Sequence, residues 1–374
     1  MKWLVIIIIF LIIGLYATGY GYVFKGIRVV YLTGHTTAFI DDHPYFTNRT
    51  IQNANSQPWE MHPKFGSITS SSGLDNLNEK YGTVAFLIIK DGQLLYENYA
   101  EGYGKLSKTN SFSMAKSITT SLLFKAIQDG YIESLDQPLT DFFPEFKGEF
   151  ASSCTVGDLS SMSSGLSWNE NYVSPFSITA QAYYDDNLRE LITGLEINEQ
   201  PGQTFKYLSG STQLLGMVIE KASNKSLSEY LSESFWKPLG MNDMGLWQLD
   251  EERGIEKSYC CISTNARNFA KFGQLYLQQG NWNGQQLIDS SFVEIATRQR
   301  FENSPEYGYG FWLSNHLDKE IFVMRGILGQ YVITIPEDNL IIVRLGHQKD
   351  RIKKEGFSMD FYGYVDEVYE MLSL

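Results

Sequence analysis

Runs of apolar and β-branched residues predict strands near both ends of the chain. The run over residues 83–90 leads through Asp91-Gly92 into a second run over residues 93–99, which predicts a β-hairpin with a tight turn. After residue 306 the pattern returns, and strands are expected over residues 309–313, 320–324, 330–335 and 340–345. A last amphipathic helix is expected over residues 361–372.

Between these strands, apolar residues recur at helical spacing. Helices are expected over residues 113–129, 212–222, 227–235 and 266–279, and prolines at positions 138, 201 and 238 interrupt the pattern. Strands at both ends and helices between them favour an α+β fold, in which helices flank an antiparallel sheet completed by distant segments. The expected body is residues 76–374, with an α/β part (76–132 and 300–374) and an inserted, mainly helical part (133–299).

The N-terminus is an uncharged apolar stretch with aromatic residues at both ends. Between Lys2 and Lys25 no side chain carries a charge. A helix over residues 3–24 would reach about 33 Å, enough to cross the hydrocarbon core of a bilayer. Residues 1–24 are therefore expected to form a transmembrane signal anchor, with the body outside the cytoplasm, periplasmic or on the cell surface. The alternative is a signal peptide cleaved near Ala17 and Gly19, which would leave a secreted protein.

Residues 25–75 are expected to form an irregular extension between this stretch and the body. Positions 35–65 are rich in Thr, Asn, Asp, His and Pro and show little periodicity. Two interpretations stay open at this point. The extension is either a spacer that lifts the body off the membrane or a flap that lies near the functional site.

Composition limits the classes of function. With 374 residues, of which 43% are apolar, the chain is long enough to bury a large core without a disulfide or a metal. Its net charge of -13 argues against nucleic-acid binding, which needs a basic surface. No H-E-x-x-H or C-x-x-C is present, and neither a metal nor a cofactor is expected. The adjacent Cys260 and Cys261 are poorly placed to pair with each other, so they and Cys154 are expected to be structural thiols.

Chemistry is indicated by Ser113-Met114-Ala115-Lys116, an S-x-x-K at the start of a predicted helix. Three residues along a helix place the lysine amine on the same face as the serine hydroxyl. An enclosed lysine loses hydration and can take the serine proton, and the helix N-terminus favours an oxyanion. A second S-x-x-K, from Ser234 to Lys237, ends a helix and runs into Pro238, so we interpret it as structural.

The motifs that follow Ser113 resemble, in their order, those of a known family. They are L-S-S-M-S-S-G-L from residue 159, P-G-Q-T-F-K-Y-L-S-G from residue 201, W-K-P-L-G-M from residue 236 and Y-G-Y-G-F-W from residue 307. In combination they resemble the class C β-lactamase-related serine hydrolases, which include class C β-lactamases, D-amino-acid peptidases, esterases and 6-aminohexanoate-dimer hydrolases. The resemblance spans about residues 81–346 and implies a serine β-lactamase and penicillin-binding-protein-like fold.

The resemblance implies roles for several residues. Ser113 would be the acylated nucleophile and Lys116 its base partner. Tyr207 matches the tyrosine of the family's Y-x-N motif, whose hydroxyl shares the proton network, protonates the leaving group and helps to activate the deacylating water. Ser209 replaces the usual asparagine of that motif and is expected on the substrate side of the site.

The third family motif, K-T-G or H-x-G, is where this sequence departs. Its counterpart is R-G-I-L-G-Q, in which Ile327 stands at the position of the lysine or histidine and Gly329 is retained. The resemblance implies that the backbone N–H of Gln330 is the second oxyanion donor, beside that of Ser113. Backbone donors do not depend on side chains, so acyl transfer is expected to survive, whereas recognition of a substrate carboxylate is in doubt. Arg325 either supplies that charge or is a surface residue.

The expected function is hydrolysis of a small-molecule amide or ester through an acyl-enzyme, with β-lactam turnover disfavoured by Ile327. Aromatic residues near the motifs, among them Trp312 and Tyr172, would line the substrate pocket or belong to the core. An alternative of another class is a membrane-anchored, catalytically weak, penicillin-binding-like sensor or binding module. The intact serine, lysine and tyrosine favour the enzyme.

Overall fold

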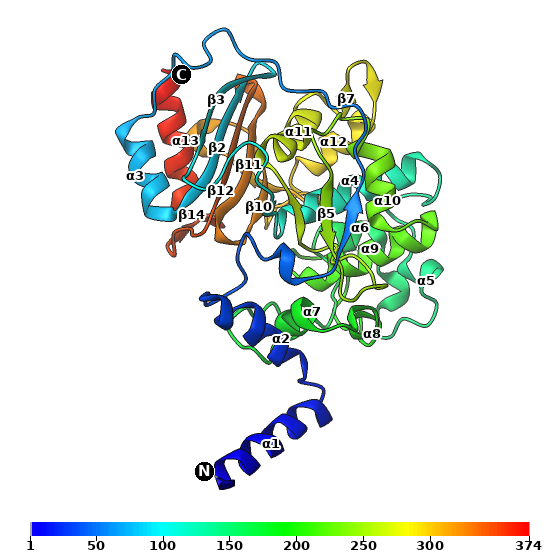
Figure 1. The fold of residues 1–374 in the computed structure, drawn as a ribbon. Helices are drawn as coiled ribbons and strands as arrows, with labels where there is room; N and C mark the ends of the chain where they lie inside the picture. The colour runs from blue at the N-terminus through cyan, green and yellow to red at the C-terminus, as the bar shows by residue number, and fades with distance from the viewer. Residues whose placement is uncertain (1, 374) are drawn as a thin grey trace.

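A six-stranded antiparallel sheet joins strands from the two ends of the body (Figure 1). The computed structural model describes residues 2–373. The strand order is β3-β2-β12-β11-β10-β9. The bounds are β2 Thr83–Lys90, β3 Gln93–Tyr99, β9 Trp312–Ser314, β10 Ile321–Gly326, β11 Gln330–Ile335 and β12 Leu340–Gly346. The predicted first hairpin therefore pairs with the last predicted strand, as an α+β fold requires.

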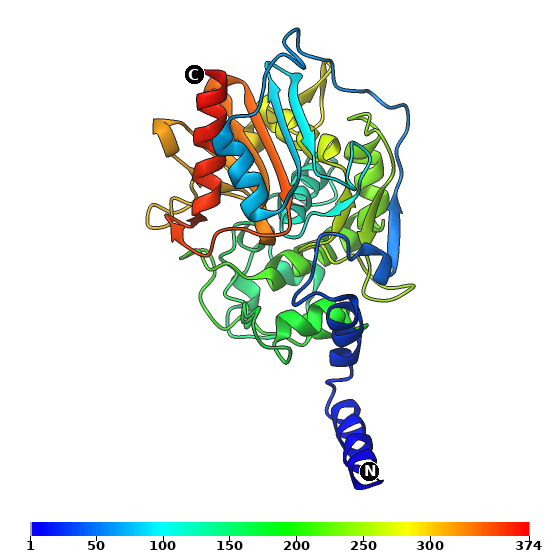
Figure 2. The ribbon, with the colours of Figure 1, turned by 60° about the vertical axis from the view of Figure 1, so that its left-hand side comes forward.

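Helices cover both faces of this sheet (Figures 1 and 2). α3 (Ser72–Tyr81) and α13 (Met359–Leu372) lie on one face, and α4 (Met114–Gln128) and α11 (Ala266–Leu277) lie on the other. Successive residues of a strand point to opposite faces, so a strand that is covered on both faces is apolar throughout. This explains the unbroken apolar run of β2, whose residues from Ala85 to Ile89 belong alternately to two buried clusters.

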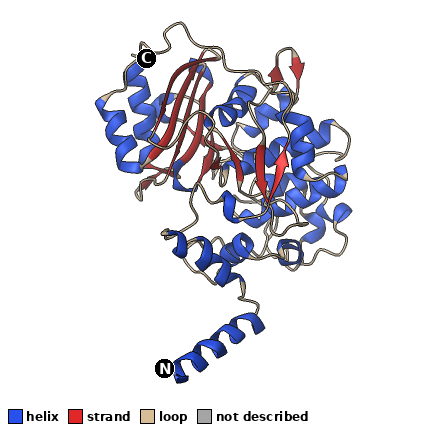
Figure 3. Cartoon of the chain, in the orientation of Figure 1, coloured by secondary structure: helices blue, strands red, loops and turns tan. Residues whose placement is uncertain are grey.

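Residues 133–299, beside the sheet, are mainly helical (Figure 3). Besides α11, the helices here are α5 Leu139–Phe142, α6 Val156–Ser160, α7 Ile178–Tyr184, α8 Leu188–Thr193, α9 Ser209–Ser223, α10 Leu227–Leu231 and α12 Ser290–Ala296. A π-helical turn, Ser232–Trp236, follows α10. α9 packs against α4 and α6, so this helix connects the inserted part to the start of the body.

A second, four-stranded sheet combines two strands of the inserted part with one strand from the extension and one from the α/β part. The sequence pattern does not reveal it, because its strands are too short to show a period. Its order is β1-β5-β6-β4. The bounds are β1 Asn48–Ile51, β4 Thr109–Asn110, β5 Gly245–Gln248 and β6 Ile262–Thr264. Two small hairpins lie elsewhere: β7 Asn281–Trp282 pairs with β8 Gln285–Gln286, and β13 Lys353–Lys354 pairs with β14 Phe357–Ser358. β4 lies directly before α4, so this sheet helps to place the start of that helix.

The single N-terminal helix expected over residues 3–24 is wrong. α1 (Lys2–Ala17) ends early, and α2 (Tyr22–Val29) begins after a break. Gly19 lies in the break with a φ of +80°, a left-handed conformation that glycine adopts at no steric cost and that ends a helix. α1 extends away from the body, while α2 packs against α7 (Figure 1). Within residues 2–373, no helix combines the length and apolar character needed to cross a bilayer.

The extension over residues 25–75 packs along the body and is not a free spacer. Its strand β1 pairs with β5 of the small sheet, and residues 60–62 exchange backbone hydrogen bonds with Leu94 of β3. Ile40 is fully buried. Its carbonyl accepts a hydrogen bond of 2.7 Å from the Asn110 N–H, just before α4. The extension therefore supports the fold, and one part of it lies close to the start of α4.

The expectation for the cysteines is wrong for two of the three. Cys260 and Cys261 form a disulfide with each other. Cys261 has a φ of +74°, and this local turn of the backbone allows adjacent sulfur atoms to meet. Spacing along the chain does not reveal such a conformation, which is why the sequence reasoning fails here. Cys154 is a free, buried thiol as expected, and burial raises the pKa of this thiol.

Candidate active site

Ser113 is the N-cap residue of α4. It is partly exposed, whereas its neighbours Phe112 and Met114 are buried, so it is the accessible residue of an otherwise enclosed segment. Phe112 has a φ of +44°, which is unfavourable for a residue that carries a side chain. The Phe112 N–H donates to the side-chain oxygen of Asn110 at 2.8 Å, and this bond stabilises the strained backbone that presents Ser113.

Lys116 lies one turn along α4, on the same face as Ser113. Its Nζ donates to Ser113 Oγ at 3.1 Å and to the Tyr259 carbonyl oxygen at 2.9 Å. The residue is only 2% exposed, and both of these acceptors are uncharged oxygens. A buried amine that contacts a hydroxyl in this way is placed to exchange a proton with it. The S-x-x-K spacing therefore produces the contact that the sequence predicts.

Tyr207 lies beside the Lys116 amine, with its ring centroid 5.0 Å from Nζ. The ring packs among Phe205, Tyr307 and Trp312, and the Tyr207 and Trp312 centroids are 5.3 Å apart. Trp312 is 9% exposed, so this predicted pocket residue belongs mainly to the aromatic cluster that supports Tyr207. The predicted serine, lysine and tyrosine thus come together from α4 and from the loop before α9.

Met162 fixes the backbone on both sides of Tyr207. The Lys206 N–H donates to the Met162 carbonyl at 2.7 Å, and the Leu208 N–H donates to Met162 Sδ at 3.5 Å. Met162 has a φ of +59°, so its own backbone is held in an unfavourable conformation. The S-S-M-S-S-G stretch, which sequence analysis finds only as a motif, therefore holds Tyr207 in place.

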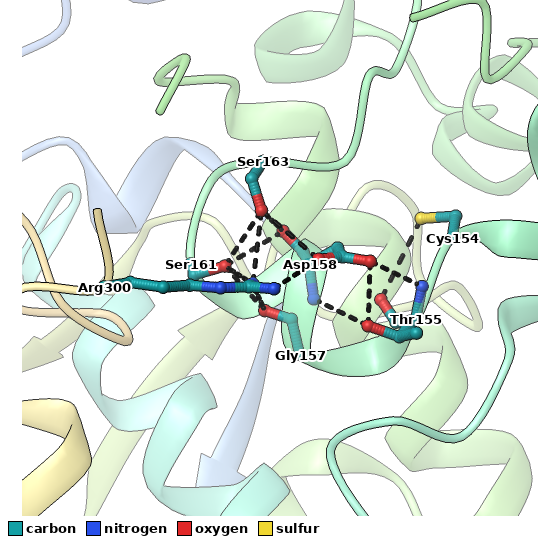
Figure 4. A network of polar contacts seen from close by, with 7 residues as sticks. All are labelled: Cys154, Thr155, Gly157, Asp158, Ser161, Ser163 and Arg300. Atoms are coloured by element: carbon teal, nitrogen blue, oxygen red, sulfur yellow. Dashed lines mark hydrogen bonds and ion pairs between the residues drawn. The ribbon is translucent and has the colours of Figure 1, made fainter. Parts of the chain in front are cut away.

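A polar network anchors this stretch (Figure 4). Arg300 forms an ion pair of 2.7 Å with Asp158 and donates to the hydroxyls of Ser161 and Ser163. Asp158 also forms a capping box with Thr155 at the start of α6. Because these groups are buried or half-buried, each depends on its partners to replace lost hydration. The network ties residues near position 300 to the loop that carries Met162.

Glu170 is a residue of the site that sequence reasoning misses. Its carboxylate accepts hydrogen bonds from the Ser209 N–H at 2.7 Å and from the Ser209 hydroxyl at 2.6 Å. The Trp168 indole donates to it at 2.6 Å, and the Tyr172 hydroxyl donates as well. Ser209 is the first residue of α9, so the carboxylate also lies at the positive end of that helix. The two residues are 39 positions apart, and no motif links them.

Ser209 and Tyr172 were both expected to face the substrate. The Ser209 side chain is 1% exposed and its hydroxyl is bonded to Glu170, which lies in the loop after the S-S-M-S-S-G stretch. Tyr172 in the same loop is 54% exposed and is accessible at the rim of this group. The structure therefore brings both residues to the Glu170 carboxylate: the contact of Ser209 is buried, and that of Tyr172 is exposed.

The third-motif segment forms a 3₁₀ turn, Ile327–Gly329, between β10 and β11. Leu328 and Gly329 are both left-handed, with φ values of +63° and +79°. A Cβ at Gly329 would lie 2.4 Å from the Arg344 guanidinium, so the position requires glycine. The fully buried Arg344 donates to the carbonyls of Leu328 and Gly329, each at 2.8 Å. Arg344 therefore fixes the backbone that leads into Gln330.

Gln330 begins β11 next to the segment that precedes Ser113. A Cβ at Gly326 would lie 2.4 Å from the Ser111 carbonyl and 3.1 Å from the Gln330 Cβ, so glycine permits this close approach. The Gln330 side chain is fully buried and donates to two backbone carbonyls, at 3.2 and 2.7 Å. Because the side chain is engaged in this way, the backbone is the part of Gln330 that remains for a role at the site.

Arg325 is not a free surface charge. Its guanidinium lies 3.6 Å from the centroid of the Trp312 ring and donates to the Gly356 carbonyl at 2.6 Å. Burial lowers the pKa of Arg325. Trp312 also packs on Tyr207, so the Trp312 ring contacts both Arg325 and Tyr207. Ile327, at the position where the family has lysine or histidine, is half-buried and packs against the core.

Comparisons with known proteins show the family and the fold in which this geometry occurs. The family model described as "Beta-lactamase" matches residues 74–357. The chain is 24% identical over 300 residues to the 6-aminohexanoate-dimer hydrolase of Paenarthrobacter ureafaciens, which covers 74% of this chain and 76% of that protein. A putative 6-aminohexanoate-dimer hydrolase from Bacillus anthracis superposes with a TM-score of 0.76 at 22% identity, covering 89% of this chain and 93% of that one. A family VIII carboxylesterase gives 0.62 at 16% identity, with 84% and 99% covered.

Proposed function

The chain belongs to the beta-lactamase family and is a serine hydrolase, and we propose that it cleaves an amide or an ester through a covalent acyl-enzyme on Ser113. Lys116 and Tyr207 serve as proton-transfer groups. The backbone N–H groups of Ser113 and Gln330 form the oxyanion hole. The observation that carries this proposal is the 3.1 Å contact between Lys116 Nζ and Ser113 Oγ at the start of α4.

The reaction proceeds in two halves. Ser113 Oγ attacks the substrate carbonyl carbon while its proton passes to the Lys116 amine, and the two backbone N–H groups stabilise the oxyanion that forms. The carbonyl bond to the leaving group then breaks, and Tyr207 delivers a proton to the departing nitrogen or oxygen. In the second half, water attacks the acyl carbon and gives its proton to Tyr207, the bond to Ser113 Oγ breaks, and Lys116 returns its proton to Ser113 Oγ as the acid is released.

A neutral amide or ester is the substrate class that the site favours. Ile327 brings no charge to the third motif, and the Glu170 carboxylate, which is bonded to Ser209 two residues after Tyr207, adds a negative one. Two similar proteins are described as a 6-aminohexanoate-dimer hydrolase and as a family VIII carboxylesterase, which supports amide and ester chemistry in this fold. Hydrolysis of β-lactams, whose recognition in the family uses the cationic third motif, is disfavoured.

A substrate panel tests the proposal. The full chain is offered a chromogenic acetate or butyrate ester, the 6-aminohexanoate dimer and nitrocefin. The expected result is steady turnover of the ester or the dimer and much slower turnover of nitrocefin. Acylation without turnover on all three would support the alternative of a catalytically weak, penicillin-binding-like sensor instead.

Replacing Ile327 with histidine is expected to change substrate choice. The imidazole restores a polar, chargeable group at the edge of the third-motif turn, so substrates that carry a carboxylate should gain relative to neutral esters. A change of about tenfold in the ratio of their kcat/KM values is the expected scale for one charge-assisted hydrogen bond. Ile327→Leu is the matched control, and an unchanged ratio in Ile327→His would remove this residue from the account of specificity.

We also propose that residues 1–24 direct the body out of the cytoplasm, with membrane anchoring preferred over cleavage and secretion. In support, α1 is apolar, and Trp3, Phe10 and Ile13 are exposed on it. Expression of the full chain followed by fractionation and N-terminal sequencing tests this. An intact N-terminus in the membrane fraction supports the anchor, a chain beginning after Ala17 in the medium supports secretion, and an intact chain in the cytoplasm contradicts both.

A further inference from the structure

Residues 258–262 line the side of α4 that carries Lys116. The Ser258 carbonyl accepts a hydrogen bond from the Thr119 hydroxyl, and the Tyr259 carbonyl accepts one from Lys116 Nζ, both at 2.9 Å. Further along, the Ser111 N–H donates to the Ile262 carbonyl at 2.8 Å, and the Ile262 N–H donates to the Ser111 hydroxyl at 3.0 Å. The beginning of this segment is therefore bonded to α4, and its end is bonded to Ser111, two residues before Ser113.

The chain turns between these two sets of contacts at Cys260 and Cys261. Their disulfide closes a small covalent ring through the intervening peptide, which leaves the backbone few alternative conformations. Cys261 is in the left-handed region, with a φ of +74°, where residues with side chains are rarely stable. The Cys260 carbonyl accepts from the Trp247 indole, and the Cys261 carbonyl accepts from the Gln248 N–H, both at 3.1 Å.

Both cysteines are almost fully buried, at 3% and 1% exposed, and neither contacts the reacting serine directly in the hydrogen-bond pattern described above. Their effect on the site passes through the residue that precedes them, Tyr259, whose carbonyl is one of two oxygens bonded to Lys116 Nζ. This carbonyl fixes the position of the amine, while Ser113 Oγ is its partner in the reaction. A shift of the carbonyl would let the amine rotate away from the serine.

We propose that the Cys260–Cys261 disulfide is a positioning element of the catalytic site, which holds the Tyr259 carbonyl against Lys116 and so keeps the amine directed at Ser113. The inference rests on the proposed role of Lys116 as the proton-transfer partner. Loss of the disulfide frees the left-handed turn to relax and weakens the bond from Lys116 to Tyr259. The proposed effect is on the position of the proton-transfer amine and not on substrate binding, so the predicted consequence is a lower kcat with an unchanged KM.

Reduction tests this in the native covalent chain. A dithiol such as dithiothreitol transfers two electrons and two protons, the S–S bond breaks to give two thiols, and the dithiol closes to its own disulfide. The full chain carrying Cys154→Ala is prepared once under oxidising conditions and once with dithiothreitol present throughout. Because Cys154 is absent, the number of free thiols measures only the reduction of Cys260 and Cys261. We expect kcat for ester hydrolysis to be about tenfold lower in the reduced form, with KM unchanged, and to recover on reoxidation.

Variants provide an independent arm. Cys260→Ala/Cys261→Ala in the same background should reproduce the loss in kcat without a change in KM. Val368→Ala, which removes buried volume from α13 on the far face of the sheet, is the matched control and should lower the melting temperature while leaving kcat unchanged. Equal kcat in the oxidised and reduced chains would overturn the proposal, and a reduced chain that does not fold would make the disulfide a folding staple instead.

The proposed role of Ser113 and that of the disulfide can fail separately in this experiment. If Ser113→Ala in the oxidised chain retains ester hydrolysis, the proposed function fails, whatever the disulfide does. If Ser113 is required but reduction leaves kcat unchanged in a folded chain, only the positioning role of Cys260 and Cys261 fails.

Discussion

Ser113→Ala is expected to lower kcat/KM for ester hydrolysis by about 10⁴-fold or more, because it removes the atom that forms the acyl bond. Any remaining rate would come from the oxyanion donors and from substrate binding. The substitution deletes one hydroxyl from a partly exposed position whose recorded side-chain partner is Lys116, so the fold should persist. The measurement is steady-state hydrolysis of a chromogenic butyrate, with the melting temperature as the check on folding.

The second S-x-x-K offers a control within the same chain. Ser234 lies inside the π-helical turn and is buried, and Lys237 is exposed, so this pair lacks the helix-N-terminal setting of Ser113. Ser234→Ala is expected to retain full activity per folded molecule. Undiminished turnover in Ser113→Ala, with loss in Ser234→Ala, would mean that the wrong serine has been assigned.

Lys116→Met is expected to lower kcat/KM by about 10³-fold, since methionine fills a similar volume but cannot accept the serine proton. The buried amine donates to two uncharged oxygens. Removing it loses these hydrogen bonds, which lowers the free energy of unfolding, but it also removes the cost of burying a polar group, which raises it. The melting temperature is therefore expected to change by only a few degrees. Activity within tenfold of the unsubstituted chain would exclude Lys116 as the base.

Lys237→Met is the matched control for this substitution. It makes the same chemical change on the exposed lysine of the second motif. Among the described contacts, the Lys237 amine makes no hydrogen bond to a hydroxyl. Its kcat/KM should equal that of the unsubstituted chain. A parallel loss in both variants would indicate a general effect of lost positive charge on this acidic protein and not proton transfer.

Most of the main sheet could be predicted from the sequence because five of its six strands have six residues or more and are rich in apolar residues. The exception is the short β9, Trp312–Ser314, which was expected over residues 309–313. The expected runs over residues 83–90, 93–99 and 330–335 coincide with β2, β3 and β11. The small sheet could not, because β4, β5 and β6 are held by pairing with distant segments and not by a local period. α3 was missed for a related reason: it is short and polar, and it is stabilised by packing on α13.

The meeting of the proposed reacting groups could be predicted because their chemistry dictates local spacing. Ser113 and Lys116 must share a helix face, and Tyr207 has a sequence setting of its own. Residues that position these groups follow no local spacing pattern in the sequence. Glu170 binds Ser209, and Arg344 binds the Leu328 carbonyl, although the partners are far apart along the chain. A residue that acts through tertiary contacts is identified only when the fold is known.

Two predictions failed where one local backbone conformation decides the outcome. Apolar composition suggested a continuous helix over residues 3–24, but the left-handed Gly19 divides it. Adjacency suggested that Cys260 and Cys261 could not pair, but the left-handed Cys261 brings their sulfur atoms together. In both cases the prediction rested on hydrophobicity or spacing alone. One residue with a positive φ decides the observed conformation.

Covalent labelling of the nucleophile tests the central claim most directly. The full chain is treated with a phosphonate ester that forms a stable bond to an activated serine, and the modified peptide is identified by mass spectrometry while residual ester hydrolysis is followed. The account predicts one label per chain on the peptide that contains Ser113, with hydrolysis lost in proportion and no label in Ser113→Ala. A label on another residue, or hydrolysis that continues after Ser113 is fully labelled, would contradict it.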